Sequence, residues 1–361
     1  MKEILLHIGK QKTGTTSLQE YFYKNRKKLR ENGVYYPKTG LRGQSHSEIA
    51  GILQQPVNPS NQVLIEELLR EITNCGFHKI IISCEGLEKV SPQKLKNVFT
   101  GYQLKPIVYL RNQVDFLASS YLQHIQETFK STALEDFLTL SRNSKLDYKG
   151  YLRKYKSVFG NDIGVSLYDK DYLYNGDIVD DFLEKYLKEE RSSLPERNNL
   201  RRNRSIGWHT ARFKLALNEH IATQEKTPVR LFLILENLSN HFMKDEKFEF
   251  TPDQKREIYE RYHATNMAVS EEYFGGYVFD KLKINQDAGC FTLNSDTAEF
   301  LEQCRLYSQS SFYIYRFLRS RINAFSKPHY RLSTTGFIRA ITCDMQMIIR
   351  NKFYYLLNKL R

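Results

Sequence analysis

Apolar runs alternate with segments of helical periodicity along the first half of this 361-residue chain. The runs have the length and bulk of buried strands, and they span residues 4–8, 34–36, 79–84, 106–111 and 163–168. The segments between them place apolar side chains three and four residues apart, which predicts helices over 18–29, 60–72, 115–127, 134–140 and 148–159. Strands that alternate with helices predict an α/β fold, in which a parallel central sheet carries helices on both faces.

The second half of the chain is predicted to be mainly helical. Helical periodicity continues from residue 177 to residue 274, and glycine, asparagine and aspartate accumulate over 280–294. We therefore predict a main domain over residues 1–280 and a basic, mainly helical C-terminal extension over residues 281–361.

The positive charge of the chain is concentrated in this extension. The formal net charge is +13, and residues 305–361 hold eleven Lys and Arg against Asp344 alone. A basic helix with an apolar face, predicted over 337–359, suits a membrane surface or an acidic polymer. Packing on the main domain with a solvated basic face is the other interpretation. A nucleic acid partner is not expected.

Cysteine usage and hydropathy indicate the cellular compartment of the protein. The five cysteines, at positions 75, 84, 290, 304 and 343, lack metal-finger spacing, so we expect reduced thiols and no metal site. A strand follows directly after Glu3, and no stretch approaches the roughly 18 apolar residues of a membrane-spanning helix. We expect a cytoplasmic protein that is at most peripheral to the membrane.

A polar loop with two glycines follows the first strand and leads into a helix. Backbone amides at such a turn point into one concavity, and the helix N-terminus adds about half a positive charge, so the loop suits a phosphate group. Gly9 and Gly14 have Walker A spacing, but Thr15 stands where a nucleotide triphosphatase has its lysine, and the basic residue is Lys12. A plain strand-to-helix turn is the alternative interpretation.

A second polar motif begins at the end of the strand over 106–111. Arg111 ends this strand, and Ser119 follows two helical turns later. A guanidinium and a hydroxyl in this arrangement can bind one phosphate together. Alternatively, Arg111 pairs with Asp115 and Ser119 is a solvated helix residue.

Together the two motifs resemble those of the sulfotransferases that use 3′-phosphoadenosine-5′-phosphosulfate (PAPS). The second motif is similar to R-[ND]-P-x-D-x-x-x-S-x-Y in that family, except that Gln113 replaces proline, which is expected to loosen the start of the helix. The resemblance implies a P-loop-like fold, 3′-phosphate binding by Arg111 and Ser119, and a contact from Lys12 to the oxygen between phosphate and sulfate. It also implies that the loop binds the 5′-phosphate through Thr13, Gly14, Thr15, Thr16 and Ser17.

The family places a catalytic His or Glu after the strand that corresponds to residues 79–84. Glu85 stands there and is the predicted base, since a carboxylate of ordinary pKa is ionised at neutral pH. A helix-cap or surface carboxylate is the alternative. His46, predicted to lie on a loop, is the second candidate base, and substrate binding or no role are its other interpretations.

Three further residues have two interpretations each. Arg202, in the basic cluster 201–204, is a candidate to close over the 3′-phosphate or to meet an acidic acceptor. Lys10 either assists the loop or is a solvated lysine. Trp208 either stacks on a purine or sugar, or packs in a helix core.

Taken together, these features predict a bacterial, cytoplasmic PAPS-dependent sulfotransferase that needs no metal. By analogy with glycan-modifying members of the family, the acceptor is expected to be a hydroxyl of a carbohydrate, as in polysaccharide biosynthesis. Two other classes stay open: a P-loop kinase-like phosphotransferase, and a non-catalytic, membrane-peripheral protein that binds polyanions.

Overall fold

The computed structural model describes residues 1–56, 59–128, 130, 133–140, 146–195, 248–276 and 278–279, with scattered positions between 206 and 236. Contacts divide the chain into two compact units. The first contains the described residues up to Leu117, those over 146–195 and those from Pro252 onward. The second contains those from Ala118 to residue 140 and the described positions between 206 and 251. The predicted extension, residues 281–361, lies outside the described residues.

A five-stranded parallel sheet forms the centre of the first unit, with the strand order β2-β3-β1-β4-β5. All five predicted strands are present, and they are β1 (Glu3–Ile8), β2 (Val34–Tyr35), β3 (Lys79–Cys84), β4 (Gln103–Leu110) and β5 (Gly164–Leu167). The central strand β1 pairs with β3 on one side and β4 on the other. The carboxyl ends of β1, β3 and β4 therefore lie next to one another, which is where parallel sheets bind ligands.

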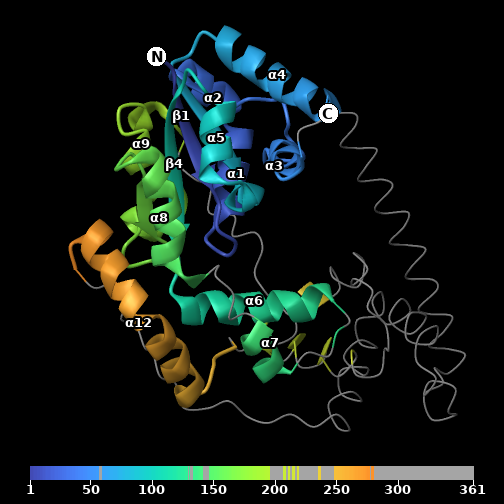
Figure 1. Cartoon of the computed structure of the whole chain (residues 1–361), viewed down its shortest axis with the longest axis vertical. Coiled ribbons are helices and arrows are strands. Elements are labelled where there is room, and N and C mark those ends of the chain that lie inside the picture. Colours follow the sequence, from blue (N-terminus) through green and yellow to red (C-terminus); the bar gives the residue numbers. More distant parts are fainter. Residues whose placement is uncertain are drawn as a thin grey trace, which may run out of the picture. The chain divides into compact units, whose positions relative to one another are not determined.

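Helices cover both faces of the sheet, as the alternation of buried side chains along β1 requires. Ile4, Leu6 and Ile8 belong to one apolar core with residues of α3 (Ser47–Leu53), α4 (Pro59–Asn74), α5 (Pro92–Val98) and α8 (Tyr148–Phe159). Leu5 belongs to the core on the other face, with residues of α1 (Thr15–Lys24), α2 (Arg26–Glu31) and α9 (Ile178–Tyr186). The predicted α/β class is confirmed (Figure 1).

Most helix predictions agree with the structure to within a few residues. The helix α8 and α7 (Leu134–Leu140) have the predicted bounds, and α6 spans Gln113–Glu127. The helix predicted over 18–29 is divided into α1 and α2 at Asn25. The helix α3 and the 3-10 helix η1 (Glu85–Lys89) are additional elements, and α12 (Pro252–Phe274) contributes to the first unit. In the described part of the chain, none of the helices is long and apolar enough to span a bilayer.

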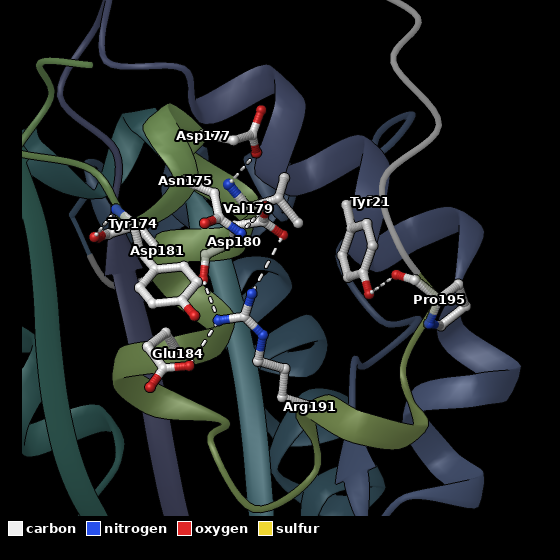
Figure 2. A network of polar contacts seen from close by, with 10 residues as sticks. All are labelled: Tyr21, Tyr174, Asn175, Asp177, Val179, Asp180, Asp181, Glu184, Arg191 and Pro195. Atoms are coloured by element: carbon white, nitrogen blue, oxygen red, sulfur yellow. Dashed lines mark hydrogen bonds and ion pairs between the residues drawn. The ribbon is translucent and has the colours of Figure 1, made fainter. Parts of the chain in front are cut away.

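A polar network fixes α9, the helix that packs behind the polar loop. Asp177 caps it by accepting a hydrogen bond from Val179 N at 2.8 Å. Arg191, on the 3-10 helix η4 (Arg191–Ser193), donates to Glu184 Oε2 at 2.7 Å and lies over the ring of Tyr174 at 4.3 Å (Figure 2). This network holds the N-terminal end of α9, whose first residue, Ile178, lies within 3.2 Å of a Cβ built on Gly14.

The described residues of the second unit pack around aromatic rings. The rings of Tyr121 and Phe137 lie 5.1 Å apart, and those of Trp208 and Phe248 lie 4.6 Å apart. Buried Lys214 donates to the carbonyl oxygen of Thr128 at 2.6 Å. Burial lowers the pKa of Lys214 to about 7.

Candidate functional site

The polar loop between β1 and α1 is held in one conformation by its backbone. Gly14 has a φ of +72° and its carbonyl oxygen accepts from Ser17 N at 2.9 Å, which begins α1. Thr13 is buried, and its hydroxyl donates to the carbonyl oxygen of Lys10 at 2.6 Å. The first turn of α1 has no acidic side chain of its own, and the N-terminus of the helix adds partial positive charge to the loop. The loop has the features of an anion site.

Lys12 lies at the turn of this loop in the left-handed region, with a φ of +65°. A side chain with a Cβ pays a cost of roughly 1 kcal/mol in that region, where glycine pays none. The side chain of Lys12 is half-buried, and its charge lowers the pKa of Glu85. The ammonium of Lys12 is therefore close enough to the carboxylate of Glu85 for the two charges to interact.

Glu85, the first residue of η1, is hydrogen-bonded to the loop. The hydroxyl of Thr15 donates to Glu85 Oε1. Burial raises the pKa of Glu85, while the hydrogen bond from Thr15 and the charge of Lys12 lower it in part. A carboxyl group whose pKa is raised from its usual range is better matched to proton transfer near neutral pH. This contact places Glu85 beside the loop, and its role as the base stays a prediction.

Arg111 connects the two motifs that the sequence singled out. Its Nη1 donates to the carbonyl oxygen of Lys12 at 2.8 Å, across 99 residues of chain. The guanidinium also lies 5.6 Å from the ring centre of Tyr168. The alternative ion pair with Asp115 is not among the contacts of Arg111 within the described residues. A guanidinium has five N–H donors, so one loop contact is compatible with binding a phosphate as well.

Tyr168 is a site residue that the sequence reading missed. It follows β5, and its backbone N–H donates to the carbonyl oxygen of Leu110 at 2.6 Å. A Cβ placed on Gly14 would lie 2.7 Å from the ring of Tyr168. Its position as the last residue of a predicted strand was the available signal, because the carboxyl ends of neighbouring parallel strands meet.

Lys10 is buried and lies against η1. Its side chain is 3% exposed, and its Nζ lies 2.5 Å from Glu88 Oε1 and 4.4 Å from the ring centre of Tyr151. The interpretation of Lys10 as a solvated lysine is therefore wrong. Because Thr15 contacts Glu85 and Lys10 contacts Glu88, the loop is tied to one short 3-10 helix at two points.

His46 is a fully buried residue of the fold. Its Nδ1 accepts a hydrogen bond from Ser83 N at 3.2 Å, so Nε2 carries the proton and donates to the carbonyl oxygen of Pro37, also at 3.2 Å. Burial lowers the pKa of His46 to about 4. Both ring nitrogens are occupied by the backbone, which argues against His46 as the second candidate base.

Gln113 fixes the start of α6, contrary to the loosening expected from the missing proline. It exchanges two amide hydrogen bonds with Asn266 of α12, at 2.8 and 2.9 Å, and donates to the carbonyl oxygen of Leu146 at 3.3 Å. The preceding residues are held as well, since Asn112 donates to Phe279 O and Tyr148 donates to Arg111 O. The segment that carries Arg111 is thus fixed by side chains in place of a proline.

This amide pair gives a test of how α6 is anchored. Replacing Asn266 by leucine leaves the buried amide of Gln113 without its main partner, and we expect a loss of about 2 kcal/mol in the free energy of unfolding. The double variant Gln113→Leu/Asn266→Leu removes both amides and is expected to recover part of that loss. Urea denaturation of the three proteins measures the coupling, and strictly additive losses would contradict a direct pair.

Two predicted ligands of the 3′-phosphate are not brought to the loop by any described contact. Ser119 lies half-buried on the part of α6 that belongs to the second unit, so its role stays a prediction. Arg202 lies outside the described residues. Trp208 packs against Phe248, in agreement with the helix-core interpretation. Among the described residues, no cluster of His, Cys, Asp or Glu has the form of a metal site.

Comparisons with known proteins give a structural similarity and no sequence match. No protein-family model and no curated protein sequence matches the chain. Among solved structures, the chain is similar to the crystal structure of a sulfotransferase from Alicyclobacillus acidocaldarius, with a TM-score of 0.39 and 13% sequence identity over 76% of this chain and 96% of that one. At this level of similarity, the residues of the site carry the functional proposal.

Proposed function

We propose that the protein transfers a sulfuryl group from PAPS to a hydroxyl of a carbohydrate. The observation that supports this most directly is the hydrogen bond from Arg111 Nη1 to the carbonyl oxygen of Lys12. It joins the two motifs that resemble the 5′- and 3′-phosphate motifs of the sulfotransferases. Neither motif alone is specific, but their contact at one edge of a parallel sheet supports the binding of both phosphates of one nucleotide there.

The chemistry of the loop fits the donor. Gly14 supplies the left-handed turn before α1, and the α1 N-terminus and Lys12 supply positive charge. Thr13 to Ser17 would hold the 5′-phosphate, and Arg111, with Ser119 and Arg202, would hold the 3′-phosphate. When bound, PAPS supplies an activated sulfuryl group on a phosphate leaving group.

Two side chains would do the chemical work of this chain. The ammonium of Lys12 would stabilise negative charge that develops at the loop, because a fixed cation is most effective where charge increases in the transition state. Glu85 would accept the proton of the acceptor hydroxyl through its carboxylate oxygens. Its raised pKa supports this role, since it brings the carboxyl group closer to neutral pH. With His46 buried against the backbone, Glu85 is the base that we propose.

The experiment is a transfer assay with radiolabelled PAPS and a panel of oligosaccharides and glycolipids, in the presence of EDTA. We expect labelled carbohydrate with undiminished yield in the chelator. Phenols and steroids serve as the comparison acceptors, and labelling of these alone would contradict the carbohydrate assignment. Turnover of ATP that depends on magnesium, without sulfuryl transfer, would instead favour the kinase-like class. For the C-terminal extension, docking to a membrane surface or to an acidic polymer and packing on the main domain stay the two interpretations.

A further inference from the structure

The hydroxyl of Thr15 is the only polar group of its side chain, and it donates to Glu85 Oε1. The side chain of Thr15 is buried, at 2% exposure. Close packing holds the pair together, because a Cβ built on Gly9 would meet Thr15 Cγ2 at 2.5 Å and Glu85 Cγ at 3.1 Å. Gly9 therefore permits the approach of the first turn of α1 to η1.

Thr15 also stands at the first position of α1, within the loop that we assign to the phosphate. A hydroxyl has one proton to donate. If the hydroxyl donates its hydrogen bond to a phosphate oxygen instead, Glu85 loses that hydrogen bond. Both acceptors are anions, so each of them competes for the same donor.

The ionisation of Glu85 depends on a small number of neighbours. Burial raises its pKa, and the negative charge of Glu88 adds to this, whereas Thr15 and Lys12 lower it. Glu88 is itself paired with Lys10, and the thiol of Cys84 precedes Glu85 in the chain. Thr15 is thus one of the two described groups that favour the ionised carboxylate, and the other, Lys12, faces the same anion site.

We propose that Thr15 is a positioning residue whose hydroxyl is shared between Glu85 and the bound phosphate. Binding of PAPS then releases Glu85 to accept a proton. This inference rests on the proposed function. It adds a coupling between binding of the nucleotide at the loop and proton acceptance by Glu85. Before the donor binds, Thr15 holds the carboxylate against the loop. Once the phosphate takes the hydroxyl and adds negative charge nearby, the proton affinity of Glu85 rises.

The consequence is proton uptake on binding, which calorimetry measures without knowledge of the acceptor. Adenosine 3′,5′-bisphosphate is titrated into the protein in buffers of different ionisation enthalpy, over a pH series, in EDTA. A rise of about one pKa unit gives at most ~0.5 proton per site. We expect the wild type to take up more protons than Glu85→Gln. Subtracting the uptake of Glu85→Gln from that of the wild type removes the contribution from protonation of the nucleotide itself.

The Thr15 variants separate the shared hydroxyl from simple electrostatics. Thr15→Val keeps the shape but lacks the hydroxyl, so the pKa of Glu85 is already raised before binding, and uptake is expected to be clearly smaller than in the wild type. Thr15→Ser restores the hydroxyl and is expected to restore the uptake. Circular dichroism spectra and melting curves of all four proteins establish that they are folded.

The outcomes distinguish this inference from the function on which it rests. Equal proton uptake by the wild type and Glu85→Gln, with the nucleotide bound by both, would overturn the shared hydroxyl and leave the proposed function standing. Equal uptake by Thr15→Val and the wild type would overturn it as well. Absence of nucleotide binding by the wild type would overturn the proposed function itself.

Discussion

Replacing Gly14 with alanine is expected to weaken nucleotide binding by about a hundredfold or more. The new Cβ would lie 2.7 Å from the ring of Tyr168 and 3.2 Å from Ile178, and the backbone there has a φ of +72°. Relief of these contacts displaces the loop amides, and each charge-assisted hydrogen bond to the phosphate that is lost costs about 1.5–3 kcal/mol of binding free energy, which reaches that factor for one or two bonds. Strain and overpacking together are expected to lower the free energy of unfolding by ~2–4 kcal/mol. Titration with adenosine 3′,5′-bisphosphate and urea denaturation measure the two effects.

Gly33 offers the matched control for this substitution. Its φ is +80°, yet a Cβ at Gly33 would meet nothing within 4 Å. Gly33→Ala therefore carries the backbone cost, about 1 kcal/mol, without the clash, and nucleotide affinity is expected to be unchanged. If Gly14→Ala bound the nucleotide as tightly as Gly33→Ala, the loop would not be the phosphate site.

Replacing Lys12 with alanine is expected to lower the rate of sulfuryl transfer by about 10²- to 10³-fold. The loss is of this size because the ammonium is assigned to charge that develops during the reaction. Affinity for adenosine 3′,5′-bisphosphate is expected to fall by less than about tenfold, since the charge of a half-buried lysine contributes modestly to a ground-state complex. The transfer assay with the acceptor found for the wild type gives the rate, and calorimetry gives the affinity.

The unusual backbone of Lys12 supplies a control that separates its amine from its conformation. Lys12→Gly also lacks the amine but relieves the strain of a φ of +65°, so it is expected to be about 1 kcal/mol more stable than Lys12→Ala and equally inactive. Gln11→Ala, on the exposed neighbour in the same loop, is expected to retain activity. Activity in Lys12→Gly close to that of the wild type would exclude the ammonium from the reaction.

The sheet and most helices could be predicted because their signals are local. Each strand is an apolar run bounded by polar residues, and α8 shows helical periodicity over its whole length. The helix α3 was missed because its start carries no clear capping signal: its N-cap residue is His46, which makes no side-chain capping hydrogen bond. The division of the first helix at Asn25 was missed as well, since the apolar spacing continues through it.

Side-chain partners were harder to predict because they depend on residues distant in the chain. Lys10 reads as a loop lysine until η1 places Glu88 beside it, 78 residues later. From the sequence, Gln113 is only a replacement for proline at the start of a helix, because its partner Asn266 lies far away in the chain, on α12. His46 reads as a candidate base until its burial against Ser83 is known. In each case the residue type was known from the sequence, but the role of the residue depends on contacts that only the fold creates.

The candidate site was predicted in outline for a related reason. Residues that follow parallel strands meet at one edge of the sheet, so Gly14, Glu85 and Arg111 could be placed near each other from their positions alone. That Arg111 contacts the loop backbone, and that Thr15 contacts Glu85, are details of tertiary packing. Ser119 and Arg202 stay predictions.

The central claim is that the loop and Arg111 hold the two phosphates of one nucleotide. Calorimetric titration with adenosine 3′,5′-bisphosphate in EDTA tests it most directly, comparing the wild type with Arg111→Ala and with Arg153→Ala, a control at an exposed arginine of α8. We expect metal-independent binding by the wild type and the control, and affinity at least tenfold lower for Arg111→Ala, because a guanidinium–phosphate pair is worth about 1.5–3 kcal/mol. Equal affinities of all three proteins would contradict the claim.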